Sequence, residues 1–191
     1  MKEYLSYEKR KNRIALSDAA DVSLKAWFYF LKMIFAIDLY LMEYIKMYYE
    51  EITIEHLDEL ASSYVETFNS EPWNDEWTIC TAEKRLHQMI NTEDSYGLCA
   101  YRDGVMCGAI IGCMEQFYNG IMFNVKEFWV KNGMRGNGIG TQIFAEFEKK
   151  LKEKQVSEII LFTSKGDFTE HFYHKQNMKS NPQMIFMHKK I

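Results

Sequence analysis

The chain has 191 residues, of which 47% are hydrophobic, and a formal net charge of −4. This is the composition of one ordinary soluble domain with a sizeable core, and the acidic balance argues against a general nucleic-acid binder. The four cysteines, Cys80, Cys99, Cys107 and Cys113, have no C-x-x-C spacing and lie in apolar segments. We therefore expect buried free thiols and a cytoplasmic location rather than disulfides or zinc ligands.

The N-terminal part contains a strongly apolar segment at residues 26–45, which Lys32, Asp38 and Glu43 interrupt. A membrane-spanning helix needs about 20 mostly apolar residues without central charges. We therefore predict a helical appendage over residues 1–46 with no transmembrane span. Its apolar side would be buried against the domain, against a second subunit in a homodimer or, as the weaker alternative, at a membrane surface.

From residue 47 to residue 191 the pattern indicates a second unit, a domain of alternating strands and helices. The segment Tyr48–Ile52 predicts a strand, and Thr53 can cap a helix that reaches Phe68, because apolar residues recur there at intervals of three and four. A polar loop with two tryptophans follows. The later predicted elements are a helix at 81–90, a hairpin turning at Asp103-Gly104, a hairpin from Phe117 to Val130, a helix from Gly138 to Lys154, a strand at 157–163, a helix at 168–175 and a closing strand from Met184 to Lys189. This order predicts an α+β fold, with a mixed sheet and helices on its faces.

The stretch Val130–Phe144, VKNGMRGNGIGTQIF, places four glycines and an arginine at the start of a predicted helix. Backbone N–H groups in such a turn point one way, and the helix dipole adds positive potential, so the turn suits a phosphate group. Arg135 could add a charge-assisted contact. The simpler alternative is a tight strand-to-helix connection. A Walker loop and a dinucleotide fingerprint are both excluded by spacing, because Thr141 stands where the latter needs a glycine.

The segment Arg135-Gly136-x-Gly138-Ile139-Gly140 resembles the acyl-CoA diphosphate loop of the GNAT superfamily of N-acetyltransferases. The segment HFYHKQNMK, His171–Lys179, is similar to the part of that family in which a tyrosine lies beside the CoA sulfur. The resemblance covers residues 47–191, with Asn132 in place of a frequent proline and Asn177-Met178 in place of Gly-Phe. It implies a GNAT-like, mostly antiparallel sheet with helices on both faces, and acetyl-CoA as the donor, with CoA as product. The implied cofactor-binding residues are Phe128, Trp129, Val130, Arg135, Gly136, Asn137, Gly138, Ile139, Gly140, Thr141 and Tyr173.

Acetyl transfer to an amine requires a base, because an alkyl amine with a pKa of about 10 is protonated at neutral pH. Glu127 precedes the glycine-rich loop and lies near the base position of the family. The alternatives are an exposed glutamate in a cross-strand pair, or Glu115 as the base. By the same resemblance, Tyr173 protonates the departing thiolate; its alternative role is core packing beside Phe172.

The acceptor side of the predicted site is the loop after the first helix of the domain. It carries Trp73, Asp75 and Trp77, and two indole rings among carboxylates suit a cationic amine. Tyr118, in the hairpin before Glu127, could add to the same wall. The alternative is that the tryptophans fold back on the core. Polyamines, aminoglycosides and protein N-termini or lysines remain open as acceptors.

Two functional hypotheses follow from these residues. The preferred one is an acetyl-CoA-dependent N-acetyltransferase that acts on a small-molecule or peptide amine by direct attack in a ternary complex. The second keeps the CoA site without turnover, as a sensor or assembly module. We predict no metal site, because His171 and His174 lack a third ligand, and no nucleic-acid partner.

Overall fold

The computed structural model describes residues 27–35, 47–166 and 168–191. The chain divides into two units, Met1–Lys46 and Met47–Ile191, and each is described by itself. Residues 27–35 are helical; the rest of the predicted N-terminal helix, including Asp38 and Glu43, lies outside the described residues. Across the described ranges, no helix has both the length and the apolar character needed to cross a bilayer.

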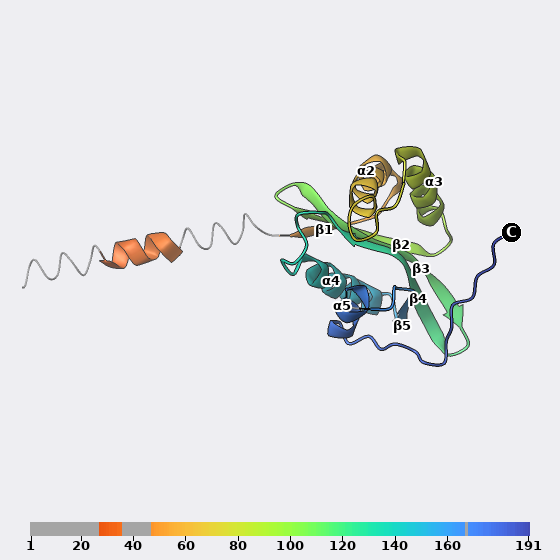
Figure 1. The fold of residues 1–191 in the computed structure, drawn as a ribbon. Helices are drawn as coiled ribbons and strands as arrows, with labels where there is room; N and C mark the ends of the chain where they lie inside the picture. The colour runs from red at the N-terminus through yellow and green to blue at the C-terminus, as the bar shows by residue number, and fades with distance from the viewer. Residues whose placement is uncertain (1–26, 36–46, 167) are drawn as a thin grey trace, which may run out of the picture. The chain divides into compact units, whose positions relative to one another are not determined.

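The second unit is built on one five-stranded sheet in the order β1-β2-β3-β4-β5 (Figure 1). Neighbouring strands are antiparallel except β4 and β5, which are parallel. This confirms the predicted α+β class with a mixed, mostly antiparallel sheet. The strands are β1 (Tyr48–Glu51), β2 (Ser95–Arg102), β3 (Val105–Phe117), β4 (Gly120–Val130) and β5 (Val156–Leu161).

Helices cover both faces of this sheet. Figure 1 shows α2 (Leu57–Phe68) and α3 (Ile79–Ile90) on one face, with α4 (Ile139–Glu153) and α5 (Thr169–Lys175) on the other. A short 3-10 helix, η1 (Ile54–His56), precedes α2, so Thr53 caps η1 rather than α2 itself. The helix expected at 81–90 begins earlier, because Thr78 provides the cap by accepting a hydrogen bond from the Thr81 N–H.

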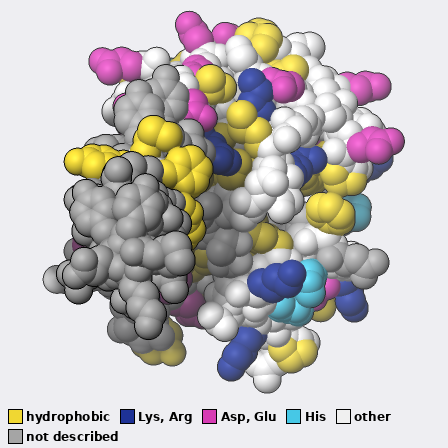
Figure 2. All heavy atoms as spheres, turned by 90° about the vertical axis from the view of Figure 1, so that its left-hand side faces the viewer, with side chains coloured by type: hydrophobic (Ala, Val, Ile, Leu, Met, Phe, Trp, Pro, Cys, Tyr) yellow, Lys and Arg dark blue, Asp and Glu magenta, His cyan; other side chains and the backbone are white. Residues whose placement is uncertain are grey.

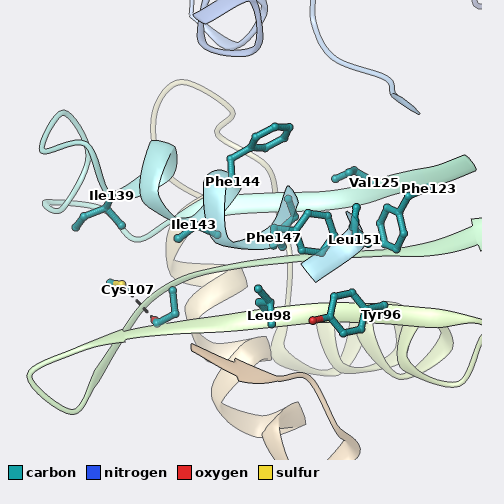
Figure 3. Packing of buried hydrophobic residues seen from close by; sticks show 12 residues of the cluster. Tyr96, Leu98, Cys107, Phe123, Val125, Ile139, Ile143, Phe144, Phe147 and Leu151 are labelled. Carbon is teal, nitrogen blue, oxygen red and sulfur yellow. Dashed lines mark hydrogen bonds between the residues drawn. The ribbon is translucent and has the colours of Figure 1, made fainter. Parts of the chain in front are cut away.

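Each helix pair buries its own apolar core against the sheet. On the α4 side, Ile143 and Phe147 lie one helical turn apart and pack with Phe123 of β4 (Figure 3). On the α2 and α3 side, Leu60 and Leu86 form a cluster with Trp129 of β4. Strands β2, β3 and β4 therefore each contribute residues to both cores.

A break in the strand register decides which face each residue of β4 uses. Ile111 of β3 pairs with Glu127 and Gly112 pairs with Val125, so Lys126 is an extra, bulged residue. Because of this bulge, Val125 packs in the core beside α4, whereas Trp129 packs beside α2. Glu127, two residues before Trp129, shares the α2 and α3 face.

Two expectations from the sequence are wrong. The closing strand predicted from Met184 to Lys189 is not a strand, and Met184 to Met187 are exposed. Apolar composition predicted the strand, but a strand forms only where its backbone pairs with a neighbour, and this segment pairs with none of the strands in the described part of the chain. The expectation of buried thiols holds for Cys99 and Cys107, whereas Cys113 is only half-buried and Cys80, in the first turn of α3, is exposed.

Candidate active site

The glycine-rich loop leaves bare backbone at the start of α4. Gly136 and Gly138 have φ values of 81° and 74°, which favour glycine, and Gly138 is the N-cap of α4. A Cβ atom added at either glycine would meet nothing within 4 Å. The first turn of α4 contains no acidic residue. An anion could therefore approach this backbone without meeting a side chain or a negative charge.

Unpaired N–H groups lie at the same place. Within the described part of the chain, the backbone N–H groups of residues 136–141 have no hydrogen-bond acceptor before Gln142, which donates to the Gly138 carbonyl. Free N–H groups at a helix N-terminus are the usual ligands of a phosphate. The cradle therefore fits a diphosphate in both charge and space. Figure 2 shows one face of the molecule, on which Asp and Glu side chains lie mainly towards the top and Lys and Arg side chains occur in both the upper and the lower part.

The Arg135 side chain is engaged elsewhere. Its Nε donates to the Val130 carbonyl (3.1 Å), a terminal nitrogen donates to the Glu71 carbonyl (3.1 Å), and its guanidinium carbon lies 4.6 Å from the centre of the Trp73 ring. The other terminal nitrogen is buried without an acceptor. In this arrangement the Arg135 side chain ties the tryptophan loop to the end of β4.

The outer edge of β4 opens just before the glycine-rich loop. Strand β5 pairs with β4 only from Ile121 to Val125, whereas β3 pairs with β4 as far as Val130. The Lys131 N–H donates to the Cys107 carbonyl of β3, so by alternation the N–H and C=O groups of Phe128 and Val130 point to the open edge, where the Val130 carbonyl already accepts from Arg135 Nε. An amide-bearing chain could pair with this edge like an added strand.

The Trp129 side chain does not face this edge. It is 2% exposed, and its Nε1 donates to the Ser63 hydroxyl at 3.0 Å. The backbone of Trp129 pairs with Ala109 of β3, so neither its side chain nor its backbone N–H and C=O groups reach the open edge, unlike those of the other two predicted cofactor-binding residues of the strand.

Glu127 is enclosed and ion-paired. Its side chain is 11% exposed, and its Oε1 accepts hydrogen bonds from Nε (2.8 Å) and a terminal nitrogen of Arg85 on α3. The Tyr64 hydroxyl of α2 is a further neighbour and lowers the pKa of Glu127. Burial raises the pKa of Glu127 above its ordinary value, and the hydrogen bonds and charge of Arg85 oppose this rise only in part. The structure thus differs from the alternative of an exposed glutamate in a cross-strand pair.

Glu115 lies further towards the β3–β4 turn. It is four residues along β3 from Ile111, the partner of Glu127. Its Oε1 accepts from the Asn124 amide (3.0 Å) and lies 3.9 Å from the Lys126 ammonium, and its side chain is 38% exposed. Of the two carboxylates, Glu127 is the one whose charge acts on Tyr173.

Tyr173 of α5 packs its ring on Phe144 (centroids 6.2 Å apart) and Phe172 (5.2 Å). Burial, followed by the Glu127 charge, raises the pKa of Tyr173 to about 12. The hydroxyl therefore stays protonated and can donate a hydrogen bond. Full proton transfer to a thiolate with a pKa of about 8.5 would be uphill by roughly three pKa units. The two candidate catalytic residues thus come from opposite faces of the sheet and interact through charge.

The loop after α2 is held by its own hydrogen bonds. Trp77 packs edge-on against Tyr64 (5.2 Å), and its Nε1 donates to Asp75 Oδ2 (3.0 Å). Trp73 packs against Phe68 at 5.1 Å, and the Asn69 side chain binds the Trp77 backbone. Both indoles fold back on the core in part, as the alternative reading expects, and both border the Glu127 face.

Tyr118 is not brought to this group of residues. It is 99% exposed in the β3–β4 turn. Glu127 lies seven residues beyond Gly120, the first residue of β4, which is about 23 Å along a strand.

Two residues of the site, Arg85 and Tyr64, were missed by sequence reasoning. Arg85 directly precedes the buried Leu86, and Tyr64 belongs to an apolar stripe, so both appeared to be structural positions. A charged residue at the border of a buried helix face was the available signal for Arg85. Across the described residues, no group of three His, Cys, Asp or Glu side chains could hold a metal ion.

Comparisons with known proteins agree with this geometry. The fold is similar to that of a possible acetyltransferase from Clostridium difficile 630, with a TM-score of 0.65, 15% identity and coverage of 76% of this chain and 98% of that one. An aminoglycoside acetyltransferase from an uncultured soil metagenomic sample, in complex with sisomicin, gives a TM-score of 0.60, 14% identity, and coverage of 76% and 96%. An aminoglycoside N-acetyltransferase in complex with CoA gives a TM-score of 0.58 and 15% identity, and the match covers 77% of this chain and 97% of that one.

At these identities the likeness shows the fold alone, and no curated protein matches the sequence significantly. Residues 57–178, which are more than half of the chain, match the acetyltransferase (GNAT) family. The chain is therefore a member of the acetyltransferase (GNAT) family.

Proposed function

We propose that the protein is an acetyl-CoA-dependent N-acetyltransferase that acts on a small-molecule or peptide amine by direct attack in a ternary complex. The observation that supports this most is the position of Glu127, which is an enclosed carboxylate beside the open edge of β4, with the Tyr173 hydroxyl within range of its charge. Acetyl-CoA, when bound, supplies an activated acetyl group.

The cofactor would be held by backbone. The N–H groups of residues 136–141 would bind the diphosphate, and the open edge at Phe128 and Val130 would bind the amides of the pantetheine arm. An N–H on the same edge can stabilise negative charge that develops on the acetyl oxygen. Support comes from a structure of similar fold that contains CoA.

Glu127 would remove the proton from the acceptor ammonium, directly or through one water molecule. The raised pKa makes it a stronger base than an ordinary carboxylate, while Arg85 keeps it ionised. General-base catalysis contributes about 10²- to 10⁴-fold to a rate. Tyr173 would donate a hydrogen bond to the departing sulfur, and its pKa of about 12 makes this role favourable over full proton transfer.

The test is release of free CoA thiol from acetyl-CoA on a panel of polyamines, aminoglycosides, amino acids and peptides. We expect thiol release with at least one amine class, a loss of about 10²- to 10⁴-fold in Glu127→Gln, and no comparable loss in Glu115→Gln, which carries the same change on the neighbouring strand. If acetyl-CoA raises the melting temperature but no amine gives thiol release, the proposal is overturned and the CoA-binding module is favoured. A homodimer through residues 1–46, the cytoplasmic location and the absence of a nucleic-acid partner stay predictions.

A further inference from the structure

Arg85 has unused hydrogen-bond donors next to the proposed base. A guanidinium carries five N–H groups, and Arg85 directs only one edge, Nε and one terminal nitrogen, at Glu127 Oε1. Among the described residues, Glu127 is the one hydrogen-bond acceptor of the Arg85 side chain. The Arg85 side chain is 41% exposed, whereas that of Glu127 is 11% exposed. The remaining donors of Arg85 therefore lie at the accessible side of the ion pair, where an acceptor must arrive.

Both indole faces that could have received a cationic acceptor already carry an arginine of the chain. The Arg85 guanidinium carbon lies 5.8 Å from the centre of the Trp77 ring, and that of Arg135 lies 4.6 Å from the centre of the Trp73 ring. A polycation would have to displace these side chains or lie beside their charges. Each indole ring of the loop is thus covered by an arginine from another element, Arg85 of α3 or Arg135 of the glycine-rich loop, contrary to the cation-binding role expected from the sequence of the loop.

The same site also holds negative charge beside Arg85. Asp75 is a second carboxylate whose charge acts on Glu127, and it is fixed by the hydrogen bond from Trp77 Nε1. The site is therefore bipolar: carboxylates at the position of the reacting amine, and an arginine edge directly beside it. This charge pattern matches a zwitterion more closely than it matches a simple amine or a polyamine.

We propose that the acceptor is an amino acid or a related small amine that bears a carboxylate, and that the free edge of Arg85 binds this carboxylate. The inference rests on the proposed transferase function and names its substrate class. Arginine binds carboxylates through paired, charge-assisted N–H···O bonds. One such interaction corresponds to about 10- to 100-fold in affinity, and the partial exposure of Arg85 places the effect near 10-fold.

Matched pairs of acceptors that differ only in the carboxylate test this directly: tryptophan with tryptamine, lysine with cadaverine, and alanine with ethylamine. For wild type we expect kcat/KM to be about 10-fold higher for the preferred amino acid than for its decarboxylated twin. In Arg85→Gln that ratio should fall to about one, and Arg85→Lys should restore it only in part, because lysine lacks the paired donors. Lys84→Gln, an exposed neighbour on α3, removes the same charge and should keep the wild-type ratio.

The ratio is the decisive quantity, because Arg85→Gln also removes the partner of Glu127 and is expected to slow both members of a pair. An equal loss for both members, or a wild-type enzyme that ignores the carboxylate, would overturn the inference. Calorimetric titration of the same pairs into CoA-loaded protein separates the two proposals. Carboxylate-dependent binding that Arg85→Gln abolishes, without acetyl transfer, would retain this inference and reject the transferase. Acetyl transfer without a carboxylate preference would retain the transferase and reject this inference.

Discussion

Substituting Gly138 by alanine should separate the folding role of the glycine-rich loop from its binding role. Gly138 has a φ of 74°, and an added Cβ meets nothing within 4 Å. The folded state therefore has room for the methyl group but carries the left-handed backbone at a cost of about 1–2 kcal/mol. In a domain of this size, 1 kcal/mol lowers the melting temperature by roughly 3 °C. Stability alone should thus fall modestly.

Gly104, in the β2–β3 turn, is a matched control for that strain. It has the same φ of 74° and equally empty surroundings, but it is distant from the α4 N-terminus in sequence and belongs to another turn. We expect Gly104→Ala and Gly138→Ala to lose similar stability. Only Gly138→Ala places a methyl group where a diphosphate would approach the backbone, so only it should weaken CoA binding, by about 10- to 100-fold for one lost charge-assisted hydrogen bond.

Thermal shift with CoA measures this difference. At a CoA concentration of 100 times the wild-type Kd, binding stabilises the protein by about 2.7 kcal/mol, and a 30-fold weaker Kd reduces this to about 0.9 kcal/mol. Gly104→Ala should keep the full shift and Gly138→Ala about a third of it. Equal CoA-induced shifts in both variants would refute the cradle, and the glycines would then serve only the chain turn.

Three further substitutions test other parts of the site. Glu127→Gln should abolish most activity, yet its melting temperature at pH 7 should be no lower than that of wild type. Burial raises the Glu127 pKa, so the stability that Glu127 contributes below its ordinary pKa is lost as the pH rises through the raised pKa. A clear fall in melting temperature would show that the ion pair stabilises the fold. Tyr173→Phe should lower kcat by about 10-fold without abolishing transfer, since only a hydrogen bond to sulfur is lost; complete inactivity would argue for obligatory proton donation. Arg135→Met should destabilise the protein by about 1 kcal/mol and raise the acceptor KM more than the acetyl-CoA KM, because it frees the loop carbonyl of Glu71. The reverse order of KM effects, measured by varying each substrate in turn, would place its side chain at the diphosphate instead.

The sequence was most informative where local pattern and tertiary packing agree. The helix after the glycine-rich loop was predicted from the spacing of Ile139, Ile143 and Phe147, and these residues are buried as expected. The hairpin at Asp103-Gly104 was found from its turn residues. The order of strands and helices sufficed for the fold class because a sheet with helices on both faces is the packing that buries such elements.

The failures have a common physical cause, which is that long-range partners are invisible in local sequence. The ion pair of Arg85 with Glu127 joins residues 42 positions apart, and the turn of Arg135 towards Trp73 joins two separate loops. The bulge at Lys126 sets the face of Glu127 through pairing with β3. The segment from Met184 to Met187 looked like a strand, but whether it pairs is decided outside the segment.

The most direct test of the account is a single-turnover experiment over a range of pH. Protein preloaded with acetyl-CoA is mixed with an accepted amine, and the acetylated amine, free CoA and protein mass are followed together. We predict that acetylated amine and CoA appear at the same rate and that this rate falls as the pH drops through the raised Glu127 pKa. In Glu127→Gln this transfer should be lost, and the protein mass should stay unchanged throughout. An acetylated protein before the amine is added, or transfer at the wild-type rate in Glu127→Gln, would contradict it.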